Sequence, residues 1–280
     1  MKFSSVIGMI LGVGALAVAI TMEGAELDRF LSESAALIVF GGTLGATLTS
    51  FPLDQVMKLP KLIVKAITGG GSSMPPARAV ELFVHLAEKA RREGLLSLEE
   101  EAGKIDDPFV RKGMLLVVDG IDPEVVKDVL EVDLAAMAER HHLGYGMLEA
   151  MGGYAPTMGI IGTVMGLVHV LSSLEDPSGL GGAIAVAFIA TLYGVASANL
   201  LWLPLGGKLK AQSKEEIALR EVAMEGILAV QAGDNPRIVR EKLEAFLAVG
   251  ERGLKAAKKG SASAERSGSS REPAVATGRG

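Results

Sequence analysis

The 280-residue chain contains no cysteine, and this absence excludes both a disulfide framework and a thiolate metal site. It also suits a protein that faces a reducing cytoplasm. Aromatic residues make up only 4% of the chain. The net charge is −5 and the pI is about 5.5, so the excess of positive charge that nucleic-acid binding relies on is missing. We therefore expect no nucleic-acid partner.

Recognisable catalytic motifs are absent as well. The sequence has no phosphate-binding glycine loop followed by Lys and Ser or Thr, and no nucleophile elbow. Its four histidines do not form a metal-ligand motif; they are His85, His141, His142 and His169. The adjacent pair His141-His142 would point in different directions on a helix. We therefore expect no enzymatic activity, no cofactor and no metal site.

Long uncharged apolar runs are what the sequence does contain. The mean hydropathy is +0.36, and 49% of the residues are hydrophobic. A membrane-spanning helix needs about 20 mostly apolar residues. Four runs meet this requirement: Phe3–Met22, Ser34–Leu53, Ala150–Leu174 and Pro177–Gly207. We predict an all-α integral membrane protein with four transmembrane helices and a helical cytoplasmic domain; the first run lacks a good cleavage site and is predicted to be a span rather than a signal peptide.

The distribution of Lys and Arg predicts how these spans are oriented. The segment 54–149 carries 12 of the 28 basic residues and the segment 208–280 carries 14, whereas the two other loops hold only Arg29. Both termini and the middle segment are therefore predicted to be cytoplasmic. The expected parts are helices 1 and 2 in 1–53, a cytoplasmic helical domain in 54–149, helices 3 and 4 in 150–207, a cytoplasmic helical tail in 208–259 and a disordered tail in 260–280.

Proline and capping signals predict where the cytoplasmic helices begin. The predicted starts are Pro75-Pro76, a capping box at Ser97-Leu98-Glu99-Glu100, Asp107-Pro108, Asp122-Pro123, Leu209 and Pro236. The helix that starts after Asp122 is expected to continue into the third span. A short amphipathic helix, Asp54–Ile67, carries Lys58, Lys61 and Lys65 and is predicted to lie at the lipid surface.

The four spans contain no Asp, Glu, Lys or Arg. An ion path through lipid normally uses such an embedded group, so a partner must supply it if the chain belongs to an ion-driven machine. Thr163 and Thr191 lie mid-span, where a hydroxyl either coordinates a cation or holds helices together. Pro156 and Pro204, at the cytoplasmic ends of the third and fourth spans, are either ordinary membrane kinks or a pair of hinges.

Three segments of the sequence resemble the A subunit of bacterial flagellar stators, the MotA/PomA family within the MotA/TolQ/ExbB superfamily. They are Ala90–Glu99, Ala155–Leu167 and Ala190–Gly194, and Lys214–Gly226 is similar to a cytoplasmic helix of the family. The motifs are specific in combination and in order, and the resemblance covers about Met1–Val249. It implies a stator subunit of the flagellar motor in the bacterial inner membrane.

The same resemblance implies the partners of the chain. Members of the family form a ring of five around two copies of a B subunit of the MotB/PomB type. The B subunit carries an essential Asp on its single membrane helix, which fits the missing carboxylate. Ions that pass this Asp drive the ring to push the rotor protein FliG, so the only small species expected at the protein is the transported Na⁺ or H⁺.

Residue roles follow from the positions that match the motifs of the family. Arg91, Arg92 and Glu99 resemble its rotor-contact residues, and Glu100 and Glu101 are adjacent candidates for the acid. Such contacts must break quickly, and surface ion pairs are individually weak enough for this. The two functional prolines of the family match Pro156 and Pro204.

The transported ion is less clearly indicated by the same comparison. Thr163 resembles sodium-type members, and Thr191 matches a Thr common to sodium and proton types. Ala190 departs from the second Thr of sodium-type members. The balance leans slightly to sodium.

Two other functions remain open from the sequence. The related ExbB/TolQ proteins energise outer-membrane processes, but they usually have three spans and lack the segment from Arg91 to Glu99. A non-conducting membrane scaffold is the second alternative, and it would tolerate loss of the hydroxyls at Thr163 and Thr191. A self-contained channel is disfavoured because no charge is embedded in the spans.

Overall fold

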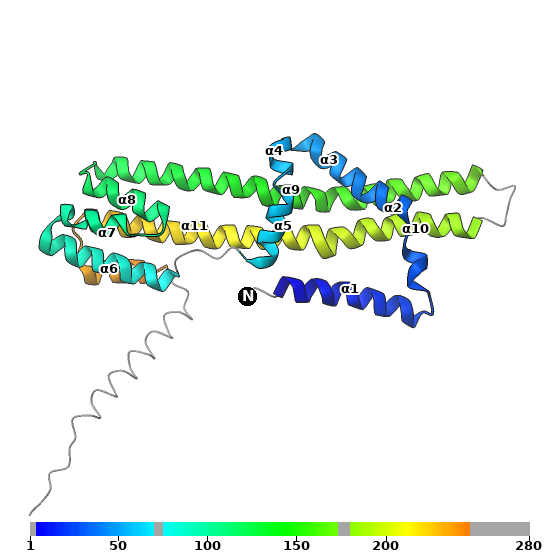
Figure 1. Ribbon diagram of the computed structural model, residues 1–280, viewed down its shortest axis with the longest axis horizontal. Helices are drawn as coiled ribbons and strands as arrows, with labels where there is room; N and C mark the ends of the chain where they lie inside the picture. Colours follow the sequence, from blue (N-terminus) through cyan, green and yellow to red (C-terminus); the bar gives the residue numbers. More distant parts are fainter. Residues whose placement is uncertain (1–3, 70–74, 173–179, 247–280) are drawn as a thin grey trace, which may run out of the picture. The chain divides into compact units, whose positions relative to one another are not determined.

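The computed structural model describes residues 4–69, 75–172 and 180–246, and every regular element in these ranges is a helix. The chain forms two compact units (Figure 1). The first contains residues 1–71 and 134–217, and the second contains 72–133 and 218–280. The predicted disordered tail, 260–280, lies outside the described residues.

The first unit begins with two apolar helical stretches. The helix α1 (Ser4–Met22) is followed by the 3₁₀ turn η1 (Leu27–Phe30). Then α2 (Glu33–Ala36), the π-helical turn η2 (Leu37–Gly41) and α3 (Gly42–Ser50) follow one another without a break. Gly12 of α1 lies against Leu200, and Gly42 of α3 lies against Met158. Small residues thus provide the contact points of both stretches, as is typical of helices in lipid.

Two long helical stretches contribute most of their length to the first unit and the rest to the second. The helix α9 (Pro123–Ser172) runs unbroken over 50 residues, which confirms the expected continuity into the third span. The helix α10 (Leu180–Ser197), the π-helical turn η4 (Ala198–Trp202) and α11 (Leu203–Gln231) form the second stretch. The sequence predicted a separate helix from Leu209, but the helix instead continues directly from the fourth span.

Three described stretches are long and apolar enough to cross a membrane: Leu27–Ser50, Pro123–Ser172 and Leu180–Gln231. The apolar part of α1, Val6–Met22, is shorter than the 18 residues that this length criterion requires. At 1.5 Å per residue it reaches about 25 Å, slightly less than the roughly 30 Å of a bilayer core. The helical membrane fold is confirmed, and the count of four spans stays a prediction.

The amphipathic segment after the second span consists of two helices, α4 (Leu53–Val56) and α5 (Leu59–Thr68), rather than the single predicted helix. The chain turns at Met57 and Lys58, and Pro60 follows in the first turn of α5. Proline is favoured there because its missing N–H would lack a partner in any case. The buried side of α5, with Leu59 and Ala66, packs into the core of the first unit.

The second unit is built from α6 (Pro76–Glu93), η3 (Leu95–Leu98), α7 (Glu99–Gly103), α8 (Pro108–Val118) and α12 (Pro236–Glu244), with parts of α9 and α11. The predicted starts at Pro76, Pro108 and Pro236 are confirmed. The Asp107 side chain accepts hydrogen bonds from the backbone N–H groups of Phe109 and Val110. Such a cap satisfies donors that the first turn of a helix leaves free.

The predicted capping box at Ser97 is wrong in detail. A helix does begin at Glu99, but its N-cap is Leu98, which makes no side-chain cap. The Ser97 hydroxyl donates instead to the carbonyl of Gly94, over 2.7 Å. Gly94 has φ +85°, a conformation that favours glycine, and the tight turn that it forms brings its carbonyl within reach of Ser97. The local turn therefore outcompetes the helix cap for this hydroxyl.

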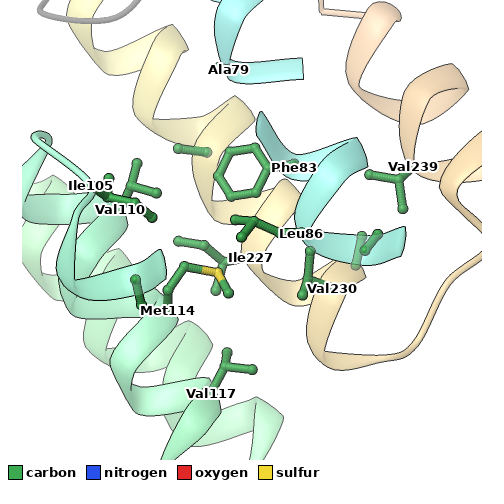
Figure 2. Packing of buried hydrophobic residues seen from close by; sticks show 14 of the residues in the cluster. Ala79, Phe83, Leu86, Ile105, Val110, Met114, Val117, Ile227, Val230 and Val239 are labelled. Carbon is green, nitrogen blue, oxygen red and sulfur yellow. The ribbon is translucent and has the colours of Figure 1, made fainter. Parts of the chain in front are cut away.

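The core of the second unit gathers residues that are far apart in the sequence. Figure 2 shows Phe83 and Leu86 of α6 beside Met114 of α8 and Ile227 of α11. All four side chains are fully buried. Gly226 makes this packing possible, because a Cβ there would lie 2.5 Å from the aromatic ring of Phe83. The ring is thus seated directly on the backbone of α11.

We predict that Phe83→Ala destabilises the second unit by about 3–5 kcal/mol, because it removes a buried aromatic ring and leaves a cavity. Amide hydrogen exchange should become faster throughout α6, α8 and residues 218–231. The matched control is Leu96→Ala, since that side chain is 76% exposed and should not change the exchange rates. Equal exchange in the Phe83 variant and the unsubstituted protein would contradict this description of the core.

Candidate functional site

The helices α9 and α10 lie side by side (Figure 1), and their backbones approach closely at several glycines. A Cβ added at Gly194 would lie 2.5 Å from the carbonyl oxygen of Ala155. One added at Gly159 would lie 2.8 Å from the carbonyl oxygen of Ala190. Both distances are shorter than real Cβ contacts, and the atoms met are rigid backbone. Only glycine fits at these two positions.

The same close contact continues along α9. Gly162 faces the Cβ of Ala190, and Gly166 faces the Cβ and Cα of Ala187. Without a hydrophobic force between helices in lipid, such close van der Waals packing is what holds them together. We call this line of contacts the α9–α10 seam. It consists of Ala155, Gly159, Gly162 and Gly166 with Ala187, Ala190 and Gly194.

The seam brings the two predicted threonines together. The hydroxyls of Thr163 and Thr191 are in hydrogen-bond contact. The Thr163 hydroxyl also lies 2.9 Å from the carbonyl of Ala187 and 3.1 Å from the carbonyl of Gly159. Four oxygens from two helices therefore meet at one point. Both side chains are half-buried.

The number of hydroxyl protons limits the hydrogen bonds that this oxygen cluster can form. Carbonyls only accept, so the single proton of Thr163 satisfies one of them while Thr163 accepts from Thr191. The arrangement links the helices, and it leaves lone pairs on hydroxyl and carbonyl oxygens. Such oxygens are the ligands that hard cations prefer. The pair is thus chemically able both to hold the helices and to contact a cation.

The two predicted hinge prolines lie where α9 packs against the stretch from α10 to α11. Pro156 lies inside α9, and its Cα is 3.1 Å from the position of a Cβ at Gly194. Pro204 follows the π-helical turn η4, and its neighbour Leu203 packs over Gly152, one turn before Pro156. Each proline removes a backbone donor from its helix, and π-helical turns are known places where helices bend.

Tyr193, within the Ala190–Gly194 segment, has a role that the sequence did not reveal. Its hydroxyl donates to the carbonyl of Phe30 at 2.6 Å and accepts from the N–H of Ser32 at 3.3 Å. The side chain therefore fastens the chain before α2 to α10. Nothing in the spacing of residues 30 and 193 indicates this contact, because it depends on the tertiary fold.

The second candidate site lies on the second unit. Arg91 and Arg92 are exposed in the last turn of α6. With Arg237 of α12 they line an open hollow of about 540 Å³. The sequence placed Arg237 at a helix start, but the packing of α12 on α6 was needed to bring it beside the other two. The carboxylate of Glu88 lines the same hollow, so three arginines outnumber one acid, and the net positive charge favours an acidic partner.

The three neighbouring acids differ in what they already bind. Glu101 is paired with Lys89 at 2.7 Å, and this hydrogen bond raises the pKa of Lys89. Glu100 is paired with Lys104, and this hydrogen bond lowers the pKa of Glu100. Glu99 is exposed, and no ion pair engages it among the described residues. Of the three acids, Glu99 is therefore the one most available to a partner.

The described ranges contain no group of three or more His, Asp or Glu side chains arranged to hold a metal ion. Two histidines lie near a carboxylate: His85 is 3.5 Å from Glu101, and His141 is 3.9 Å from Glu216. The Nδ1 atom of His141 also lies 3.1 Å from the Ser213 hydroxyl. This cluster joins α9 to α11.

Comparisons with known proteins agree over nearly the whole chain. The model of the MotA/TolQ/ExbB proton channel family matches residues 101–222. Motility protein A of Bacillus subtilis (strain 168) is 37% identical over 262 residues, which cover 94% of this chain and 96% of that protein. Motility protein A of Borreliella burgdorferi is 40% identical over 247 residues, or 88% and 94% of the two chains.

A solved structure of a similar protein has the same fold. A chain of the flagellar MotAB stator complex from Bacillus subtilis matches with a TM-score of 0.83 and 36% identity. The match covers 90% of this chain and 98% of that one. The similarity therefore includes both compact units.

We predict that cysteines at positions 163 and 191, introduced as Thr163→Cys and Thr191→Cys, form a disulfide in membranes treated with an oxidant. The contacting hydroxyls place the two Cβ atoms near the separation that a disulfide requires. The natural chain has no cysteine, so loss of maleimide labelling reports this pair alone.

Adding Gly194→Ala to that double variant should slow the disulfide formation several-fold, because the new Cβ pushes the helices apart. The matched control is Gly182→Ala, also in α10, where a Cβ meets nothing within 4 Å. The close seam would be refuted if the two alanine variants formed the disulfide at the same rate.

Proposed function

The chain belongs to the MotA/TolQ/ExbB proton channel family, and from this premise we propose that it is the A-type stator subunit of a bacterial flagellar motor, driven by Na⁺. The observation that carries the stator function is similarity to motility A proteins and to a MotAB stator chain over nine-tenths of the sequence. The family is one of ion-channel subunits and not of enzymes.

The stator assembles with a B subunit of the MotB type, as in the MotAB complex that it matches. We propose five copies of this chain around two B subunits. The B subunit supplies the carboxylate, because the four predicted spans contain no charged residue. The excess of Lys and Arg in segments 54–149 and 208–280 supports an inner-membrane protein with both termini in the cytoplasm.

The Thr163–Thr191 pair is proposed to lie on the ion path. Its oxygens and the carbonyl of Ala187 supply the ligand type that a partly dehydrated Na⁺ needs. Because the hydroxyls already bond to each other, a passing cation replaces an existing hydrogen bond and meets no unpaired group. The exchange is therefore energetically mild, as repeated transit requires.

The arginines of α6 are proposed to contact the rotor protein FliG, together with Glu99 and Glu100. Arg91 and Arg92 at the end of α6 and Glu99 at the start of α7 are all exposed, so the surface presents both signs of charge. We add Arg237, which lines the same hollow. Exposed ion pairs are worth about 0–1 kcal/mol each, which suits contacts that form and break with every step.

The prolines are proposed to be the paired hinge through which ion passage moves the helices. Pro156 lies beside Gly194, and Pro204 follows the turn η4, so both lie where α9 and the α10–α11 stretch pack together. A bend at either proline therefore alters the seam that holds Thr163. The ExbB/TolQ-like function is not favoured, because the relatives that match along nearly the whole chain include two motility A proteins.

The first test is the swimming speed of cells that lack their own stator and receive this chain with its B partner. At fixed pH, we expect speed to rise with external sodium and then saturate. Thr163→Val should raise the half-saturating sodium concentration roughly three- to tenfold, the worth of about one hydrogen bond. Thr163→Ser keeps the hydroxyl and should behave like the unsubstituted protein.

Two results would overturn parts of this proposal. Speed that does not depend on sodium would make protons the driving ion. An unchanged sodium dependence in Thr163→Val would remove Thr163 from the ion path and leave it a purely structural hydroxyl.

The second test addresses the rotor surface. Arg91→Glu combined with Arg92→Glu should abolish torque while the complex still assembles, because the sign of the contact surface is reversed. Arg237→Glu should reduce swimming speed in part. Arg240→Glu is the control, since Arg240 lies on the same helix and pairs with Glu244 at 3.7 Å outside the hollow. Normal swimming of the double variant would exclude Arg91 and Arg92 as rotor contacts.

A further inference from the structure

The helices α4 and α5 carry a second basic site that the stator function does not use. An open hollow of about 710 Å³ lies over α5 and is lined by Lys58, Lys61, Lys65 and Arg140, with Leu62 and Val64 among them. Four cations and no carboxylate line this hollow. Its volume lies within the range of pockets that hold small ligands.

The cations of the hollow are largely uncompensated. Lys58 has one exposed contact with Asp54, at 3.7 Å. No ion pair with Lys61, Lys65 or Arg140 occurs among the described residues. A smaller cavity next to it shares Lys65 and Arg140 and contains one acid, Glu216. Like charges repel, so an anion from outside would be favoured at Lys61, Lys65 and Arg140.

The same segment exposes apolar side chains beside the cations. Leu53 is 65% exposed, Met57 is 74% exposed and Val64 is 57% exposed. Leu59 and Ala66 on the other side of α5 are buried in the core of the first unit. The segment from α4 to α5 therefore exposes apolar groups in α4, in the turn and in α5, while the buried side of α5 is covered by protein. Apolar groups next to Lys and Arg are typical of helices that lie at the boundary between headgroups and acyl chains.

The position in the chain agrees with this environment. The segment begins at Leu53, three residues after the end of α3, which belongs to the membrane-crossing stretch Leu27–Ser50. A chain that leaves a span continues at the level of the headgroups. The exposed apolar residues thus meet acyl chains, and the lysines meet phosphates.

We propose that this hollow binds an anionic phospholipid, whose phosphate is held by Lys61, Lys65 and Arg140 and whose acyl chains lie against Leu62 and Val64. Charge complementarity selects an anionic headgroup, and the apolar residues select a lipid over free phosphate. The binding fixes the end of the second span at the membrane surface. This lipid site depends on the membrane placement of the chain, and it is independent of the transported ion and of the rotor contact.

The test uses the purified A–B complex, stripped of lipid in a zwitterionic detergent. Binding of a fluorescent phosphatidylglycerol is measured by titration and compared with that of the equivalent phosphatidylcholine. We expect saturable binding of the anionic lipid that weakens with added salt, and weak or no binding of the choline lipid. Inorganic phosphate at millimolar concentration should not displace the bound lipid.

The test variant is Lys61→Gln with Lys65→Gln and Arg140→Gln, which removes the charges but keeps most of each side chain. Each cation near a membrane surface contributes about fivefold in affinity, so the triple variant should lose about a hundredfold. The control is Lys112→Gln with Lys127→Gln and Arg240→Gln, three exposed cations of the second unit, and should bind normally. If the triple variant does not assemble, each single variant should lose about fivefold.

Several outcomes would overturn the proposal. Equal affinity for the two lipids, or equal binding by the triple variant and its control, would exclude a headgroup site at this hollow. Full displacement by inorganic phosphate would make it a site for free phosphate. These results would leave the stator function standing, because swimming is measured separately.

Discussion

The close approach of α9 and α10 is the constraint on which the rest of the membrane unit depends. Gly159 and Gly194 place backbone against backbone, and no larger residue fits at either position. Because lipid provides no hydrophobic force between helices, the pair is held by this contact and by the hydrogen bonds that it permits. Thr163 reaches the carbonyl of Ala187 on the other helix only because the seam is so narrow. The oxygen cluster is thus a consequence of the glycines.

The same constraint disfavours an ionisable group at the seam of this chain. A carboxylate at the seam would need space that Gly159, Gly162 and Gly166 do not leave, and a counter-charge that these spans do not contain. An unpaired charge in lipid is costly, so it must face water or a partner. The carboxylate proposed for the B subunit would meet both requirements outside the seam. Thr163 places a hydroxyl oxygen at the seam without adding a charge.

The sequence predicts the features that depend on neighbouring residues, and it misses those that depend on the tertiary fold. Asp107 followed by proline predicts a helix start from neighbouring residues alone, and the structure confirms it. The prediction of a cap at Ser97 was wrong, because its hydroxyl donates instead to the carbonyl of Gly94 in the preceding turn. The roles of Arg91 and Thr163 came from a family resemblance, since spacing alone gave each a structural alternative. Contacts such as that of Arg237 with the α6 hollow depend on tertiary packing, which no local pattern encodes.

Some charged side chains of the second unit form ion pairs within the fold, whereas others line a surface hollow. Lys89 is engaged by Glu101, and this pair connects α6 to α7 within the unit. Arg91, Arg92 and Arg237 instead line one hollow, where they repel one another. Arg237 also lies in the first turn of α12, where the helix dipole disfavours a cation. Arg91 and Arg92 are favoured by the dipole at the end of α6, and Glu88 lies in the same hollow, so Arg237 is the cation that folding explains least. The hollow keeps an excess of positive charge, which suits an anionic partner surface.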